Sequence, residues 1–168
     1  MNKLTPINFM KWINEHRDLL KPPVGNKMVW EDREFIVMVV GGPNGRTDYH
    51  VNQGEEFFYQ IEGDITLKVV EESELKDIEI KQGEIFLLPG GVPHSPQRPE
   101  NTVGLVIERK RTEGELDGLQ WYCKNCGHKV YEEFFPLKNI EKDFDAIFNN
   151  YFNNYKNYQC NKCGTLNN

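Results

Sequence analysis

The sequence predicts a mainly β domain, built as an antiparallel sandwich or barrel. Its central block, from about Met28 to Lys110, alternates short strand-forming runs with turns such as Glu62-Gly63-Asp64. No long helical pattern separates these runs, which argues against repeated βαβ units. We expect strands over Glu34–Val40, Glu55–Ile61, Ile65–Val70, Asp77–Ile80, Gly83–Leu88 and Thr102–Glu108.

The segments on either side of this block predict helices. Near the N-terminus, Thr5 is placed to cap a helix and Pro6 suits its first turn, and Pro22 and Gly25 end it. Towards the C-terminus, one helix is predicted from apolar residues at a 3.6-residue period: Ile140, Phe144, Ile147, Phe148, Tyr151, Phe152 and Tyr155. We expect this stripe to dock on the β domain or on a partner subunit.

A polar stretch divides the chain. Residues Thr112–Gly118 have the sequence TEGELDG, which is typical of a linker. The predicted organisation is therefore a β domain with the N-terminal helix over 1–111, a linker over 112–119 and a small cysteine module over 120–168.

Composition excludes several classes of function. The formal net charge of the 168 residues is -6, and the only compact basic run is Arg109–Arg111, which argues against a nucleic-acid partner. No segment approaches the roughly 18 apolar residues of a membrane span. The N-terminal segment also lacks the apolar core of a signal peptide. We expect a soluble, cytoplasmic protein without membrane or nucleic-acid partners.

The four cysteines form two CxxC pairs, Cys123 with Cys126 and Cys160 with Cys163. In a reducing cytosol this spacing favours a metal over disulfides. Four thiolates suit tetrahedral Fe, as in rubredoxin, or Zn, and the sequence does not separate the two. Because four thiolates complete the coordination shell, the expected role is structural.

Two glycine-rich clusters in the β block each carry one histidine. His50 and Glu56 flank a tight turn, and His94 follows a Pro-Gly-Gly turn. A lone histidine is more often a surface or hydrogen-bonded residue than a ligand. Two histidines and one carboxylate together suit non-haem Fe(II) with O2, or catalytic Zn. Strand alternation puts Glu55 and Glu56 on opposite faces, so only one of them can face the metal.

These clusters resemble the two motifs of the cupin family. The first is Gly45-x4-His50-x-Asn52-x3-Glu56-x6-Gly63, and the second is Gly83-x5-Pro89-x-Gly91-x2-His94. Asn52 stands where the first motif usually has a second histidine, and the spacing after Gly45 is one residue shorter. The resemblance therefore implies a metal triad of His50, Glu56 and His94, and it selects Glu56 over Glu55.

A narrower resemblance covers nearly the whole chain. The segments PPVGN, GRTDYHVNQGEEFFYQIEGDITLKV, LLPGGVPHSPQRP and TVGLVIERKR resemble the 3-hydroxyanthranilate 3,4-dioxygenase family, in its short, single-cupin form with C-terminal CxxC pairs. The resemblance implies catalytic Fe(II), no organic cofactor, and 3-hydroxyanthranilate and O2 as substrates. The implied product is 2-amino-3-carboxymuconate semialdehyde, a precursor of quinolinate in the kynurenine route from tryptophan to NAD. It also implies a homodimer.

The chemistry of this substrate and the resemblance together suggest three roles. Its carboxylate needs a planar cationic fork, for which Arg98 is the candidate. Glu108 would contact the substrate and accept a proton as it binds. The resemblance places Arg46 beside the O2 site. The alternatives are a surface ion pair for Arg98 and a solvated side chain for Glu108.

The resemblance implies substrate contacts for Glu56 and Asn26 and a supporting role for Asp48, although a turn or a hydrogen bond to a ligand residue is the plain alternative. Two other functions stay open. One is a cupin ligand sensor whose zinc knuckles bind DNA or protein. The other is a different cupin enzyme, such as a sugar isomerase, whose site would not require both Arg98 and Glu108.

Overall fold

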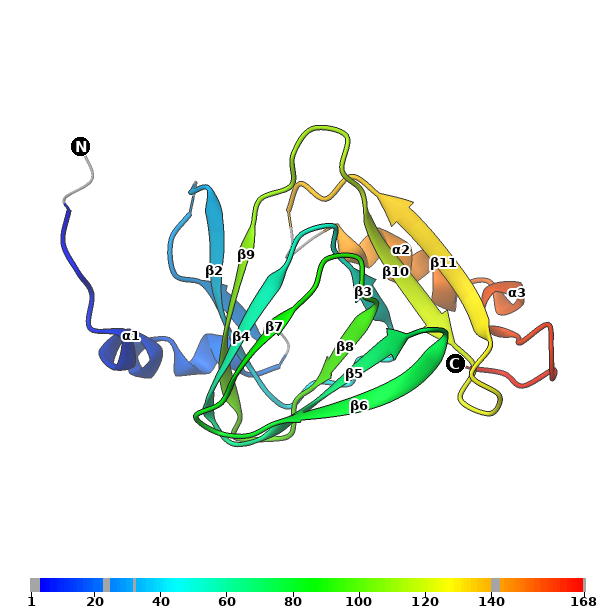
Figure 1. Cartoon of the computed structure of the whole chain (residues 1–168), viewed down its shortest axis with the longest axis horizontal. Coiled ribbons are helices and arrows are strands. Elements are labelled where there is room, and N and C mark those ends of the chain that lie inside the picture. The colour runs from blue at the N-terminus through cyan, green and yellow to red at the C-terminus, as the bar shows by residue number, and fades with distance from the viewer. Residues whose placement is uncertain (1–3, 23–24, 32, 140–142, 168) are drawn as a thin grey trace.

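The computed structural model describes residues 4–22, 25–31, 33–139 and 143–167, and it consists mainly of two antiparallel β-sheets that face each other (Figure 1). One sheet has the order β1 (Asn26–Met28), β2 (Phe35–Gly41), β9 (Val103–Arg109), β4 (Glu56–Glu62) and β7 (Ile85–Leu88). The other has the order β11 (Lys129–Phe135), β10 (Asp117–Tyr122), β3 (Tyr49–Val51), β8 (His94–Gln97), β5 (Ile65–Glu71) and β6 (Glu74–Ile80). The predicted fold class is confirmed.

All the strands expected from the sequence are present, as β2, β4, β5, β6, β7 and β9, with ends that shift by at most three residues. Five strands were not predicted from the sequence, namely β1, β3, β8, β10 and β11. The two that matter most for the site are β3 and β8. Each has only three or four residues, and β8 contains Pro96, so neither shows a clear alternation. These two short strands nevertheless carry both histidines of the predicted metal site.

Side-chain alternation directs two carboxylates into the barrel. The pairing of β4 with β9 sets Phe58 opposite Val106 and, two residues away along each strand, Glu56 opposite Glu108. Because alternate residues share a face, all four side chains lie on the inner face. The main core fills the rest of the interior with Met38, Phe58, Ile65, Leu67, Val69, Ile80, Leu88 and Val106.

The N-terminal helix begins later than the sequence suggested. Helix α1 spans Phe9–Glu15, and the Asn8 side chain caps it by accepting a hydrogen bond from the Lys11 backbone N–H at 2.9 Å. The prediction that Thr5 caps the helix was wrong, since Asn8 is the extended residue whose side chain reaches the first turn. A 3₁₀ turn, η1 (Arg17–Leu20), follows, and Leu20 packs with Ile13 against Val39.

The C-terminal segment continues the larger sheet. Strand β10 pairs with β3 on one side and with β11 on the other. Residues 117–119 of the predicted linker therefore belong to a strand, because β3 leaves an edge that they can cover. The division of the chain into a domain over 1–111 and a module over 120–168 stays a prediction.

The predicted single C-terminal helix is two helices, α2 (Phe144–Phe152) and α3 (Tyr155–Tyr158). Extended Asn154 separates them, and its side chain caps α3. Ile140 lies outside the described residues. The predicted docking of the stripe is confirmed for Ile147 and Tyr151, whereas Phe152 and Tyr155 are exposed. No helix in the described part of the chain has the length and apolar character that crossing a membrane requires.

An aromatic cluster holds α2 to the β10–β11 hairpin. Trp121 of β10 is 1% exposed and stacks on Tyr151 with ring centroids 4.2 Å apart. Replacing a buried tryptophan by alanine typically costs about 3–5 kcal/mol. We predict that Trp121→Ala lowers the free energy of unfolding by this amount, measured by urea denaturation followed by far-UV circular dichroism.

The matched control is Trp30→Ala, because Trp30 is 46% exposed. We expect this change to alter the free energy of unfolding by about 0.5 kcal/mol or less. Equal losses for the two variants would contradict the packing role of Trp121.

Candidate metal centres and active site

Three side chains from neighbouring strands converge inside the barrel. His50 of β3 lies opposite His94 of β8, and Glu56 begins β4. His50 Nδ1 lies 3.5 Å from Glu56 Oε1, and His94 Nε2 lies 3.3 Å from Glu56 Oε2. Each residue offers one ligand atom, and these atoms lie within 4.8 Å of one another. The donor set and its spacing fit one metal ion, as the sequence predicted.

The two glycine-rich motifs meet through their backbones. Gly91 N–H donates to the Asn52 carbonyl at 2.7 Å, and a Cβ on Gly90 would lie 2.2 Å from the Gln53 carbonyl oxygen. Only glycine permits so close an approach. The Pro-Gly-Gly turn therefore fits against the first motif, and this contact helps to bring His94 beside His50.

The structure distinguishes the two adjacent glutamates by their burial. Glu55 is exposed and Glu56 is 5% exposed, which confirms that only Glu56 faces the histidines. Asn52, the residue in place of a common histidine ligand, is also buried. Its side-chain N–H groups donate to Glu108 Oε2 at 2.6 Å and to Glu56 Oε1 at 3.2 Å. Asn52 therefore bridges the two carboxylates.

The two carboxylates differ in their electrostatic surroundings. Burial opposes ionisation of Glu56, but the nearby His94 and His50 lower its pKa below the usual range. Burial, followed by repulsion from Glu56, raises the pKa of Glu108 to about 8, and Arg111 opposes this rise. A divalent cation at the triad would favour the charged form of both groups.

Two arginines approach this site in different ways. Arg46 is half-buried and forms an ion pair with buried Asp48. Arg98 is 3% exposed, and its guanidinium donates to Gln60 Oε1 at 3.3 Å. Among the described residues no carboxylate lies within ion-pair distance of Arg98. Burial, together with repulsion from Arg46, lowers the pKa of Arg98 to about 10.

A cavity of about 670 Å³ joins these groups. It is lined by all the predicted site residues of the barrel, namely Asn26, Arg46, His50, Glu56, His94, Arg98 and Glu108. Asn26 Oδ1 and Glu108 Oε1 are buried acceptors that have no hydrogen-bond partner within the described part of the chain. A buried acceptor without a partner is costly, so both atoms suit a ligand that donates hydrogen bonds.

Four residues of this site were not predicted from the sequence. Phe144 and Phe148 of α2 line the cavity, and Phe144 lies against the His50 ring with centroids 5.3 Å apart. Asp117 accepts a hydrogen bond from His50 Nε2 at 2.6 Å, and Arg111 contacts both Asp117 and Glu108. Phe144 and Phe148 belong to the apolar stripe of the C-terminal helix, which predicted only that they pack against another surface. Asp117 lies in the predicted linker and belongs to no recognisable motif.

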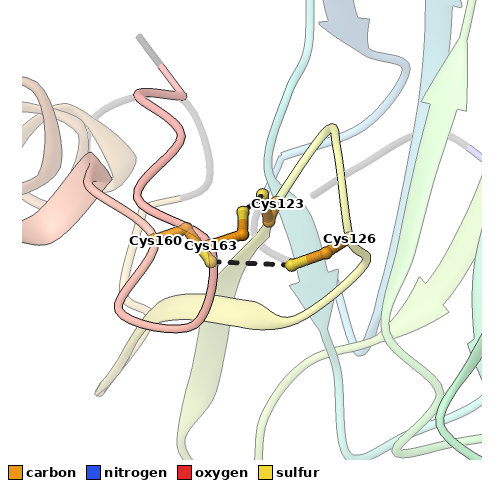
Figure 2. A group of neighbouring side chains, drawn as sticks. All are labelled: Cys123, Cys126, Cys160 and Cys163. Atoms are coloured by element: carbon orange, nitrogen blue, oxygen red, sulfur yellow. Dashed lines mark hydrogen bonds between the residues drawn. The ribbon is translucent and has the colours of Figure 1, made fainter.

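The four cysteines form a second cluster, as predicted (Figure 2). Cys123 Sγ lies 3.5 Å from Cys163 Sγ, and Cys126 Sγ lies 3.6 Å from Cys160 Sγ. Tetrahedral coordination with metal–sulfur bonds of about 2.3 Å needs sulfurs about 3.8 Å apart, so the cluster fits such an ion. Hydrogen bonds from Thr165 and Asn125 lower the pKa of Cys163 to about 5, which favours a thiolate ligand.

The two CxxC turns have matching backbones. Gly127 N–H donates to the Cys123 carbonyl at 2.9 Å, and Gly164 N–H donates to the Cys160 carbonyl at 2.8 Å. Both glycines have positive φ, at 68° and 76°. Glycine adopts this conformation without the strain of a side chain, which explains why each CxxC pair is followed by glycine.

The chain matches a family model described as 3-hydroxyanthranilic acid dioxygenase over residues 1–152. It is 56% identical to a protein from Xanthomonas euvesicatoria pv. vesicatoria named 3-hydroxyanthranilate 3,4-dioxygenase, covering 97% of this chain and 92% of the relative. A relative of the same name from Jannaschia sp. is 52% identical, with coverage of 99% and 93%.

Among solved structures, the chain is similar to a cupin-2 domain containing protein from Shewanella frigidimarina, with a TM-score of 0.49 and 21% sequence identity. That likeness covers 62% of this chain and 94% of the other. The family match and the curated relatives extend over almost the whole sequence, including the metal triad, the buried arginine and most of the cysteine module. The chain therefore belongs to the 3-hydroxyanthranilic acid dioxygenase family.

Proposed function

We propose that the protein is an Fe(II)-dependent dioxygenase that converts 3-hydroxyanthranilate and O2 to 2-amino-3-carboxymuconate semialdehyde. The aromatic ring opens between the hydroxyl-bearing carbon and its neighbour away from the amine-bearing carbon, and both oxygen atoms of O2 enter the product. The observation that carries the proposal is Arg98, a buried cation without a carboxylate partner in the described residues, beside a two-histidine, one-glutamate triad. Family membership and the names of the curated relatives support it.

The donor set of His50, Glu56 and His94 supports Fe(II) as the catalytic metal. Two histidines and one carboxylate leave coordination positions open, so iron held there would supply a redox-active centre able to bind both an aminophenol and O2. The chain's own residues have the task of binding and orienting the substrate around that ion.

Arg98 is proposed to bind the substrate carboxylate. Its guanidinium is planar and presents two parallel N–H donors, which match the two oxygens of a carboxylate. Gly104 lies against it, since a Cβ there would sit 2.7 Å from Arg98 Nη1. The arginine is thus held in a narrow space and loses little conformational entropy on binding.

Glu108 and Asn26 are proposed to contact the polar ring substituents. Glu108 Oε2 is occupied by Asn52 and Arg111. Glu108 Oε1 is buried, has no hydrogen-bond partner among the described residues, and could accept a proton from the substrate hydroxyl or amine. Asn26 Oδ1 offers a second acceptor. Arg46 is proposed to lie beside the O2 site, where its charge would stabilise a reduced oxygen species.

At the cysteine cluster we propose a structural Fe or Zn ion. Cys123 directly follows β10, so an ion there would tie this strand to the C-terminal segment that carries Cys160 and Cys163. Since thiolates complete the coordination shell, the site has no open position for a substrate.

The homodimer and the cytoplasmic location stay predictions. Ile85 and Leu87 of edge strand β7 are 64% and 54% exposed, and they lie beside Tyr59 and Phe57 of β4. An apolar surface of this kind supports contact with a second copy.

The place of the product on the route from tryptophan through quinolinate to NAD follows from the proposed reaction.

The first prediction concerns turnover. Protein loaded anaerobically with Fe(II) and 3-hydroxyanthranilate, then exposed to O2, is expected to consume one O2 per substrate and to develop the absorbance of the semialdehyde. His50→Ala is expected to abolish both signals, because it removes a metal ligand. Tight binding of 3-hydroxyanthranilate without O2 uptake by iron-loaded protein would favour the ligand-sensor alternative.

The second prediction concerns Arg98. Arg98→Lys keeps the charge but loses the planar fork, and a charge-assisted hydrogen bond is worth about 1.5–3 kcal/mol. We expect KM for 3-hydroxyanthranilate to rise about 10- to 100-fold. The control substrate is 2-aminophenol, which lacks the carboxylate, and its KM is expected to change little. An equal rise for both substrates would show that Arg98 does not bind the carboxylate.

The third prediction concerns the second metal. Elemental analysis of the purified protein is expected to find tightly bound Fe or Zn in addition to the catalytic ion, and Cys160→Ser is expected to lose that ion and to unfold at a lower temperature. The change removes one of four thiolates whose binding energy contributes to folding. Full retention of this metal and of the melting temperature in Cys160→Ser would contradict the site.

A further inference from the structure

Asp117 reaches the catalytic histidine from a strand outside the two cupin motifs. Strand β10 pairs with β3 so that Leu119 lies opposite His50, and Asp117, two residues earlier, shares the inner face with Leu119. Asp117 is fully buried, and its Oδ2 lies 2.6 Å from His50 Nε2. The contact joins residues 67 positions apart in the sequence.

This contact sets the orientation of the His50 ring. With Nε2 bonded to Asp117, the nitrogen that faces Glu56 is Nδ1, at 3.5 Å from Oε1. The His94 ring has the opposite orientation. Its Nδ1 is hydrogen-bonded to the Val92 carbonyl at 3.0 Å, and its Nε2 faces Glu56. The two histidines thus present different nitrogens to the metal position, and each ring is oriented by the partner of its other nitrogen.

Arg111 compensates the negative charge of the buried Asp117 carboxylate. An isolated buried carboxylate is strongly disfavoured. The Arg111 side chain is 7% exposed and contacts Asp117 through two nitrogens, one of them Nε at 2.7 Å from Oδ1. Its Nη1 lies 2.9 Å from Glu108 Oε2. One cation therefore lies between the carboxylate that holds His50 and the carboxylate proposed to contact the substrate.

We propose that Asp117 and Arg111 are positioning residues: Asp117 holds His50 so that Nδ1 binds the metal, and Arg111 holds Glu108 so that Oε1 faces the cavity. This inference rests on the proposed metal site but not on the identity of the substrate. It assigns function to the segment between the barrel and the cysteines, which the sequence presented as a linker.

Metal affinity tests the role of Asp117 without turnover. Protein whose cysteine site is filled with Zn is titrated anaerobically with Co(II), and binding at the triad is followed by visible absorption. Loss of such a partner of a metal-binding histidine typically weakens metal affinity about 10- to 100-fold. We expect Asp117→Asn to raise the Kd for Co(II) by this factor.

The matched control is Glu115→Gln. Glu115 lies in the same segment and pairs with Arg109, away from His50. We expect this variant to keep the wild-type Kd within about 2-fold, since it leaves the His50 contact intact. Wild-type Co(II) affinity in a folded Asp117→Asn protein would overturn the proposal, as would an equal loss in Glu115→Gln.

The orientation of the His50 ring can also be measured in the wild-type protein, which does not depend on the folding of Asp117→Asn. In ¹⁵N NMR of the wild-type protein with Zn at both sites, His50 is expected to show a protonated Nε2 that exchanges slowly with water, and a metal-bound Nδ1. Coordination of Zn through His50 Nε2 would overturn the proposal. Both experiments omit 3-hydroxyanthranilate, so their failure is distinct from failure of the proposed reaction.

The role of Arg111 is tested by a separate variant, through kcat and its pH profile. Arg111→Lys keeps the charge but cannot contact Asp117 and Glu108 in the same forked geometry. We expect Co(II) affinity to change less than in Asp117→Asn, whereas kcat falls and the pH profile of kcat shifts. An unchanged pH profile together with an unchanged kcat would remove Arg111 from the proposal.

Discussion

The pairing of β3 with its two neighbours is the constraint on which the rest of the site depends. This strand has only three residues, yet it pairs with β8 through His50 and His94 and with β10 through Leu119 and its neighbours. The first pairing brings the two histidines of the triad together. The second brings Asp117 to the far side of the His50 ring. A strand too short to be recognised from alternation thus joins the metal site to the C-terminal hairpin.

Most of the buried charges inside the barrel are paired with one another. Asp48 neutralises Arg46, and Arg111 is shared between Asp117 and Glu108. Within the described residues this leaves Glu56 facing two histidines and Arg98 facing no carboxylate. Buried charges are stable only when they are compensated. A divalent cation would compensate Glu56, and an anionic ligand would compensate Arg98. A metal ion together with a carboxylate-bearing substrate would supply both charges.

Much of the site could be predicted because its signals are local. His50, Glu56 and His94 lie in two glycine-rich motifs of recognisable spacing. Alternation shows that only one of Glu55 and Glu56 can face the metal, and the motif resemblance selects Glu56. The helix between the CxxC pairs was recognised from its period, but its break was not, because nothing in an apolar stripe marks Asn154 as an extended residue.

What could not be predicted depends on contacts between distant segments. Asp117 has no motif, and its polar surroundings are typical of a linker, so only the pairing of β10 with β3 shows that it is buried. The same holds for Asn52, which the motif comparison treated as a lost ligand and which the fold places between two carboxylates. Such roles arise from register between strands, which single-strand patterns do not contain.

Part of the apolar wall of the cavity comes from outside the barrel. The barrel supplies the charged groups together with apolar side chains such as Phe58 and Val106. Phe144 and Phe148 come from α2, which packs on the β10–β11 hairpin. A change at Phe148 therefore reshapes the cavity without altering a charged residue, whereas a change at Phe144 also alters a contact of the His50 ring. In evolution or in directed selection, the shape of the cavity can thus change through Phe148 while the charged residues of the barrel stay the same.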